Sequence, residues 1–287
     1  MMSRRRFFQN TATGALAALG ARSLLAETET PADPANGAGV LVDLTRCIGC
    51  RACENACRVR AGFDPLPAAT IGYGAGDGKL SFRTRTFIDF RDGGAEPTQP
   101  VKRQCMHCLE PACVSACPVG ALEKTKEGPV VYRESICIGC RYCLLACPFS
   151  VPKYEWDNAL MPRVGKCDFC ADRQAKGQSP ACVVACPTGT LKFGKRGDLL
   201  QEARERMDAQ PDRYRYVYGK DVVGGTSWIY LADRTPEELG FPQGLPKEPL
   251  PSLTWNALSK VPFVVIGVGL MLAAVFHWRS RNATEQA

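Results

Sequence analysis

The stretch CIGCRYCLLACP, residues 137–148, places four cysteines within eleven residues, in the spacing C-x2-C-x2-C-x3-C followed by proline. This is the ligand pattern of bacterial ferredoxins, in which three closely spaced thiolates hold one 4Fe-4S cluster and the fourth cysteine ligates a neighbouring cluster. The pattern therefore predicts a fold organised around iron-sulfur clusters.

The other cysteines repeat this pattern along the chain. The sequence holds 16 cysteines in four runs of four, so none is left over. With four thiolates for each cluster, the repeat predicts four 4Fe-4S clusters as cofactors. The runs are Cys47, Cys50, Cys53 and Cys57; Cys105, Cys108, Cys113 and Cys117; Cys137, Cys140, Cys143 and Cys147; and Cys167, Cys170, Cys182 and Cys186.

Three other uses of clustered cysteines fit the sequence less well. A structural zinc site closes with two C-x2-C pairs, whereas each run here has a third cysteine and then a fourth one four residues later. Neighbouring thiols in one loop are poorly placed to form disulfides with one another. A radical-chemistry enzyme would need a C-x3-C-x2-C triplet, and the sequence contains none.

The assignment of cysteines to clusters depends on which runs form a unit. Nineteen residues separate the second and third runs, and they contain a predicted strand, GPVVY, at residues 128–132. This favours an inner two-cluster unit, with the first and fourth runs forming an outer unit around it. Exchange of the fourth ligands within each unit gives cluster 1 (Cys47, Cys50, Cys53, Cys186), cluster 2 (Cys57, Cys167, Cys170, Cys182), cluster 3 (Cys105, Cys108, Cys113, Cys147) and cluster 4 (Cys117, Cys137, Cys140, Cys143). The alternative pairs the first run with the second and the third with the fourth.

Both ends of the chain indicate a membrane location. Residues 1–26 contain SRRRFF and a short apolar stretch, which is typical of a twin-arginine signal peptide. That route exports folded proteins, so clusters inserted in the reducing cytoplasm would survive export. Residues 261–278 are apolar except for His277, and as a helix they would be about 27 Å long, enough for one transmembrane span. We therefore expect a periplasmic body, a single span in the inner membrane, and a cytoplasmic tail at residues 279–287.

The remaining segments complete a predicted α+β fold. Residues 27–104 hold the first run and a β-rich insert that includes KLSFRTRTFIDF at 79–90, expected to form a strand or hairpin. Residues 105–150 form the predicted inner unit, and residues 151–197 hold the fourth run, which completes the outer unit with residues 47–57. Within residues 198–260 we expect a helix capped by Asp198, a strand at 226–231 and a proline-rich linker that lies on a partner subunit. The predicted fold is two interleaved ferredoxin-like units with one C-terminal transmembrane helix.

Charge and motifs exclude several other functions. The net charge of +7 falls to about +3 without residues 1–26, and no basic stripe with interleaved aromatic residues indicates nucleic-acid binding. No catalytic constellation is visible, since every cysteine is assigned to a cluster and the chain has only two histidines. His107 lies in the second cysteine run, where it either donates a hydrogen bond to cluster sulfur or packs beside the loop. His277 is expected at the membrane interface, beside a partner's quinone or haem or simply as a polar group.

Three blocks of sequence resemble a known family. RQCMHCLEPACVSACPVGAL (103–122), CRYCLLACPFSVPKY (140–154) and KCDFCADRQAKGQSPACVVACPTGTLKFG (166–194) are similar to the four-cluster iron-sulfur subunits of membrane-bound respiratory oxidoreductases. The likeness extends through residues 218–231 to the C-terminal apolar helix. Some motifs are closest to the iron-sulfur subunit of hydrogenase-2-type nickel-iron hydrogenases, and others to the beta subunit of formate dehydrogenase-N. One departure is Arg58, which stands where the other runs have proline after the fourth cysteine.

The resemblance implies a function without catalysis. A subunit of this family relays electrons between a periplasmic catalytic subunit, here a hydrogenase or a formate dehydrogenase, and a membrane cytochrome b or quinone-binding subunit. It also implies the crossed ligand pairing and two ferredoxin-like units related by a pseudo-twofold axis. The alternative function is a membrane-tethered ferredoxin that shuttles electrons between separate partners.

Overall fold

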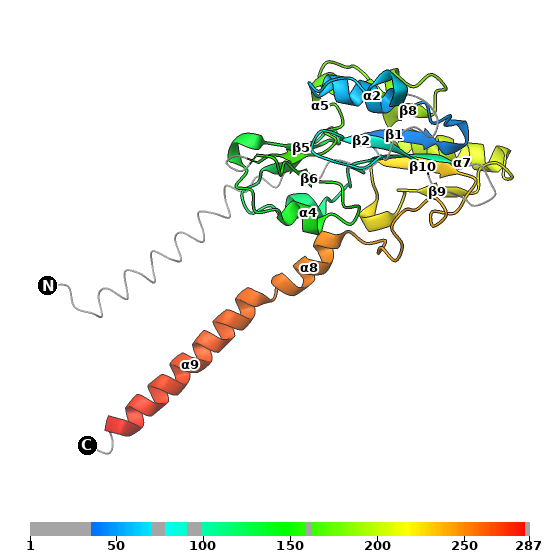
Figure 1. Ribbon diagram of the computed structural model, residues 1–287. Coiled ribbons are helices and arrows are strands. Elements are labelled where there is room, and N and C mark those ends of the chain that lie inside the picture. The colour runs from blue at the N-terminus through cyan, green and yellow to red at the C-terminus, as the bar shows by residue number, and fades with distance from the viewer. Residues whose placement is uncertain (1–35, 71–77, 91–98, 159–161, 285–287) are drawn as a thin grey trace. The chain divides into compact units, whose positions relative to one another are not determined.

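The computed structural model describes residues 36–70, 78–90, 99–158 and 162–284. The described residues lie within the unit Asp33–Ala287, and Figure 1 draws their helices and strands. The predicted signal peptide, residues 1–26, lies outside the described residues.

A four-stranded sheet forms the scaffold of the outer part of the fold. Its strand order is β8 (Leu191–Lys195), β1 (Ala38–Asp43), β10 (Trp228–Ala232) and β9 (Tyr216–Tyr218). β1 runs parallel to β10 and antiparallel to β8, while β9 is antiparallel to β10. The central strands β1 and β10 lie side by side in Figure 1 and are almost entirely buried, which explains their nearly continuous apolar sequences.

Each face of this sheet is covered by a different cluster of side chains. On one face, helix α7 (Arg196–Ala209) packs Leu199 and Ala203 against Leu41 and Ile229. On the other face, Trp228, Tyr230 and Phe169 join a larger core that also contains cysteines of the first and fourth runs. The sheet therefore rests directly against the cysteine loops and fixes their positions.

Short elements carry the cysteine loops. Three antiparallel hairpins pair β2 (Thr86–Phe90) with β3 (Pro100–Gln104), β4 (Leu122–Lys124) with β5 (Val130–Tyr132), and β6 (Lys153–Tyr154) with β7 (Val164–Gly165). The helices are α2 (Ala52–Arg60), α3 (Ala112–Ser115), α4 (Tyr142–Ala146), α5 (Ala171–Gln174) and α6 (Ala181–Val184). The described residues also form the 3-10 turns η1 (Leu44–Arg46), η2 (Ala68–Thr70), η3 (Glu134–Ile136) and η4 (Val222–Gly224).

Two predicted strands are confirmed, and two details of the prediction are wrong. Strands form at Val130–Tyr132 and Trp228–Ala232, as expected. Of residues 79–90, only Thr86–Phe90 forms a strand, because Ser81 N–H donates a hydrogen bond to the carbonyl of Thr84 and turns the chain before it. Asp198 does not cap its helix: α7 begins at Arg196 after Lys195, which places Asp198 in the first turn, where a carboxylate is still favoured by the helix dipole.

The segment predicted as a linker ends in a helix. Helix α8 (Leu250–Leu258) follows Pro249 and carries a proline in its first turn, where the missing N–H has no intrahelical partner to lose. Helix α9 (Val261–Thr284) extends beyond the predicted span of 261–278. Within the described ranges, the stretch Leu250–Arg279 is the one helical segment long and apolar enough to cross a membrane. Its most apolar part is not buried inside the protein.

Candidate iron-sulfur cluster sites

The first and third cysteine runs share one backbone turn. Gly49 and Gly139 have the same positive φ of 69°, and each is followed two residues later by an arginine, Arg51 (φ 61°) and Arg141 (φ 65°), also in the left-handed region. Only glycine takes this conformation without strain, so the arginines mark positions that the surrounding structure must hold. The turn spans the second cysteine of each run and leads into the helix that carries the third one, Cys53 in α2 and Cys143 in α4.

One cysteine-lined cavity joins the first and the last of the four cysteine runs. Cys47, Cys50 and Cys53 line this outer cavity together with Cys186 of the fourth run. Two features bring these runs together: β1 precedes the first run and pairs with β8, which follows the fourth, and α2 contacts α6. These are the four cysteines predicted for cluster 1.

The inner cavity is lined by cysteines of the second and third runs. They are Cys117, Cys137, Cys140 and Cys143, the set predicted for cluster 4. Contact between α3 and α4 brings the two runs together, and the N–H of Ala121 donates a hydrogen bond to Cys117 Sγ over 3.2 Å. Cys140 is exposed, so this cavity reaches the protein surface.

The other eight cysteines interact electrostatically in two groups. Burial, together with the Cys182 and Cys170 thiolates, raises the pKa of Cys57 to about 12, and Cys167 in turn interacts with Cys57. Burial raises the pKa of Cys108 well above its ordinary value, with contributions from Cys105, Cys147 and Cys113. These neighbours coincide with the ligand sets predicted for clusters 2 and 3.

Pairs of cysteines also connect successive groups. Cys53 of the outer cavity interacts with Cys182, Cys167 interacts with Cys105, and Cys113 interacts with Cys143 of the inner cavity. Each pair joins one predicted ligand set to the next in number. The two cysteines of each pair also lie in one cluster of buried side chains.

The protonation of these thiols depends on burial and on backbone hydrogen bonds. Burial raises the pKa of Cys53 to about 12, so without metal this thiol is protonated at neutral pH, and metal binding must release its proton. Burial also acts on Cys117 and Cys186, but hydrogen bonds outweigh it and lower the pKa of both thiols. For Cys117 they come from the N–H groups that follow it, and for Cys186 from the Thr188 hydroxyl and then from the N–H groups that follow it. Both residues precede proline at the end of a run.

The donor arrangement fits a four-iron cluster better than a single ion. All sixteen cysteines are free thiols in the described part of the chain. Yet within that part no three His, Cys, Asp or Glu side chains come close enough to hold one metal ion. A zinc ion would draw four sulfurs to about 2.3 Å from its centre, whereas a 4Fe-4S cluster takes one thiolate at each of its four irons, and four cysteines line each of the outer and inner cavities.

The structure places His107 in the packing between two loops. Its ring is fully buried and stacks on Phe169 at a centroid distance of 4.9 Å, and Nδ1 accepts a hydrogen bond from the Val130 N–H at 2.9 Å. Burial, followed by the charges of Lys166 and Lys124, lowers the pKa of His107 well below its ordinary value, so the ring is neutral. Since Phe169 belongs to the fourth run, His107 joins the loops of the second and fourth runs. His277 lies in α9.

Sequence reasoning missed two buried lysines beside the cysteines. Lys102 and Lys166 are almost completely buried, and Lys166 Nζ donates hydrogen bonds to the carbonyl oxygens of Cys167, at 3.0 Å, and Val130. The available signal was a lysine shortly before a cysteine run, in VKRQC and VGKC. That signal is weak because most lysines are exposed.

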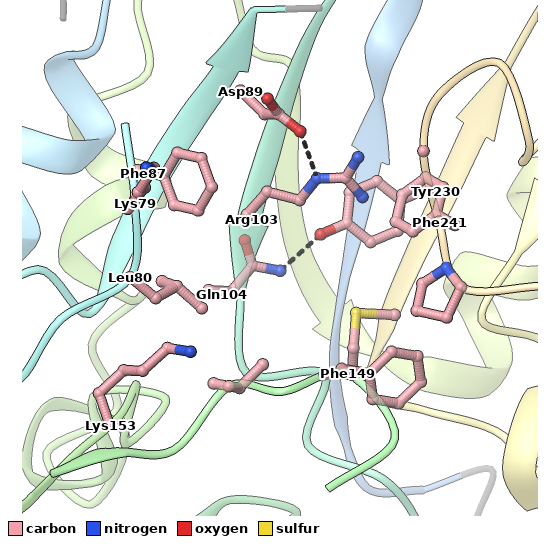
Figure 2. Close-up of a pocket in the computed structure, with 14 residues that line it drawn as sticks. Lys79, Leu80, Phe87, Asp89, Arg103, Gln104, Phe149, Lys153, Tyr230 and Phe241 are labelled. Atoms are coloured by element: carbon pink, nitrogen blue, oxygen red, sulfur yellow. Dashed lines mark hydrogen bonds and ion pairs between the residues drawn. The ribbon is translucent and has the colours of Figure 1, made fainter. Parts of the chain in front are cut away.

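A separate cavity of about 380 Å³ lies between β2, β3 and β10 (Figure 2). Its polar side chains bond to one another: Arg103 Nε lies 3.2 Å from a carboxylate oxygen of Asp89, and Gln104 Nε2 donates to the Tyr230 hydroxyl at 2.6 Å. The described residues that line it include no cysteine and no histidine. It is therefore distinct from the two cysteine-lined cavities.

Comparisons with known proteins agree with the cysteine pattern. Residues 46–122 and residues 98–196 each match a family described as a 4Fe-4S dicluster domain. A protein of Nitratidesulfovibrio vulgaris is 40% identical over 303 residues, which cover 100% of this chain and 80% of the relative. The hydrogenase-2 operon protein HybA of Escherichia coli is 34% identical over 279 residues, 84% of each chain. The chain belongs to this family of 4Fe-4S dicluster proteins.

The family also includes a formate dehydrogenase relative. The nitrate-inducible formate dehydrogenase iron-sulfur subunit of Escherichia coli is 32% identical over 249 residues, 83% of each chain. The predicted family is thus confirmed, and two dicluster domains with 16 cysteines correspond to the four 4Fe-4S clusters predicted as cofactors. Both matched ranges contain the second cysteine run, so the assignment of ligands rests on the cysteine geometry.

Proposed function

We propose that this chain is a non-catalytic electron-transfer subunit that relays electrons through four 4Fe-4S clusters. One end of the relay meets a catalytic oxidoreductase subunit, a hydrogenase or a formate dehydrogenase, and the other meets a membrane cytochrome b or quinone-binding subunit. The observation that carries the proposal is the packing of the four cysteine groups against one another, with Cys53 and Cys182, Cys167 and Cys105, and Cys113 and Cys143 each in one cluster of buried side chains.

The proposed ligands are the crossed sets, in which each cluster takes three cysteines from one run and one from its partner run. The lining of the outer and inner cavities supports clusters 1 and 4, and the cysteine neighbours support clusters 2 and 3. The antiparallel pairing of β1 with β8 supports an outer unit that encloses the inner one. When bound, the clusters supply one-electron redox chemistry, while the protein supplies thiolates, backbone hydrogen bonds and exclusion of water.

The surroundings of the inner and outer cavities suggest which partner subunit binds near each one. Helix α3, which carries Cys113 of the second run, contacts α8, the helix that leads into the apolar α9. Around the inner cavity, Ile138 and Tyr142 are exposed, and Leu145 is 84% exposed. We assign this apolar surface to the membrane subunit. Ile48, 55% exposed beside the outer cavity, marks the end assigned to the catalytic subunit.

The segment before α8 is attached to the body. The Val223 N–H donates to the carbonyl of Pro246 at 2.8 Å, and the Gly224 N–H donates to that of Lys247 at 2.7 Å. These bonds support a fixed connection between η4 and the segment that leads into the membrane helix. With a twin-arginine signal at residues 1–26, the body would lie in the periplasm, α9 would cross the inner membrane and residues 279–287 would remain in the cytoplasm.

Two measurements on the protein purified anaerobically from membranes test the proposal. Iron and acid-labile sulfide should each amount to about sixteen atoms per chain, and a value near eight would mean that half of the cysteines are not cluster ligands. Mild detergent extraction should recover the chain together with a catalytic subunit and a membrane subunit. Recovery of the cluster-loaded chain alone would instead favour a membrane-tethered carrier that moves between partners.

A further inference from the structure

Lys102 is a buried lysine on β3 that lies beside the outer cavity. It is 2% exposed and is one of the residues that line the cavity with Cys47, Cys50, Cys53 and Cys186. It also interacts electrostatically with Cys182 and Cys167 of the fourth run. One ammonium group therefore faces the proposed ligands of both clusters of the outer unit.

The immediate partners of this ammonium are neutral. Nζ donates hydrogen bonds to Thr86 Oγ1 at 2.6 Å and to Gln104 Oε1 at 3.0 Å, and it lies 4.7 Å from the centre of the Trp228 ring. In the described ranges of the chain, no carboxylate forms an ion pair with it. A buried charge without a countercharge is unfavourable, so the compensating negative charge has to come from the cysteine ligands.

A buried hydrogen-bond network fixes the position of Lys102. Gln104 Nε2 donates to the Tyr230 hydroxyl at 2.6 Å, and Figure 2 draws this bond. The Tyr230 hydroxyl in turn donates to the backbone carbonyl of Lys102 at 2.8 Å. Because Thr86, Gln104, Trp228 and Tyr230 are all buried, the ammonium cannot turn toward solvent without breaking this network.

We propose that Lys102 is the fixed countercharge shared by clusters 1 and 2 and that it raises the reduction potential of both. The proposal rests on the ligand sets assigned to these clusters under the proposed function. Reduction adds one electron to an anionic cluster, and no bond forms or breaks in the step. A positive charge held in a low-dielectric interior favours the reduced state of either cluster and weakens the repulsion between electrons that follow one another.

The test is a redox titration of the intact complex, followed by electron paramagnetic resonance, with the unmodified protein and Lys102→Met. Loss of the charge should lower the equilibrium constant for reduction of clusters 1 and 2 about tenfold. For a one-electron couple this lowers the reduction potential by about 59 mV. Clusters 3 and 4 should shift less. The signals are assigned beforehand with cysteine variants of the outer and inner cavities. Lys102→Arg, which keeps the charge, should restore the potentials.

The control is Lys192→Met, which removes an exposed lysine that pairs with Glu202. Water screens that charge, so the potentials should remain unchanged. If Lys102→Met does not retain iron, Gln104→Glu replaces it, because this nearly isosteric change puts a carboxylate where Oε1 lies 3.0 Å from Nζ, and it should lower the same potentials.

Two different failures can be told apart. Unmodified protein without cluster signals would overturn the proposed function, and the role of Lys102 with it. Unchanged potentials in fully loaded Lys102→Met, or in Gln104→Glu, would overturn only the role of Lys102.

Discussion

Paired cysteine substitutions separate the crossed from the sequential assignment of ligands. The outer cavity brings Cys186 together with Cys47, although 138 residues lie between them in the chain. If both ligate one cluster, Cys47→Ala and Cys186→Ala together remove no more iron than either change alone. Starting from about sixteen iron atoms, the double variant should retain about twelve, because one four-iron cluster is lost.

The matched control combines Cys186→Ala with Cys140→Ala. Cys140 lines the inner cavity, so crossed pairing predicts the loss of two clusters and about eight remaining iron atoms. Sequential pairing reverses both results, since Cys140 and Cys186 would then share a cluster and Cys47 would belong to another. Iron and acid-labile sulfide per chain, measured on protein of known concentration, distinguish the two patterns. About eight iron atoms in the first variant and about twelve in the second would refute the interleaved arrangement.

Three further predictions follow from the same geometry. Cys140→Ala should abolish quinone reduction by the complex while the catalytic partner stays active with artificial acceptors; unchanged quinone reduction would contradict the assignment of cluster 4. Deletion of residues 261–287 should move the cluster-loaded chain from the membrane to the soluble fraction, unless its partners alone hold it there. Trp228→Ala should destabilise the fold by about 3–5 kcal/mol, because this fully buried ring packs against Phe169. Trp255→Ala, which changes an exposed tryptophan, is the control. If Trp228→Ala lowers the thermal unfolding midpoint no more than this control does, Trp228 does not have this role in stability.

Features encoded over a few residues could be predicted from the sequence. The cysteine spacing, the strand at Val130–Tyr132 and the apolar run of α9 each depend on a single short stretch. The four-stranded sheet could not be predicted in this way, because β1 pairs Val42 with Leu191 and with Tyr230, far along the chain. The residues before the first cysteine run form a strand of this sheet only through hydrogen bonds to those distant partners.

The surroundings of buried polar groups were also beyond the sequence. Lys102 and His107 look like ordinary residues near a cysteine run, and only the fold reveals that both are buried beside cysteine loops. Prolines near residue 250 suggested an extended linker, yet Pro249 and Pro251 stand where a helix tolerates proline, at its start. In each case the residue type was visible, but its environment depended on tertiary contacts.

The cysteines of the outer cavity lie far apart in the sequence, and this has a consequence for biosynthesis. All four cysteines of the inner cavity lie between residues 117 and 143, so they leave the ribosome close together. In the outer cavity, Cys186 comes 133 positions after Cys53, a delay of about 7–27 s at about 5–20 residues per second. During that interval Cys47, Cys50 and Cys53 lack their fourth predicted ligand, and β1 lacks both of its partner strands. Under the crossed assignment, the ligand set of cluster 1 is therefore complete only after that of cluster 4.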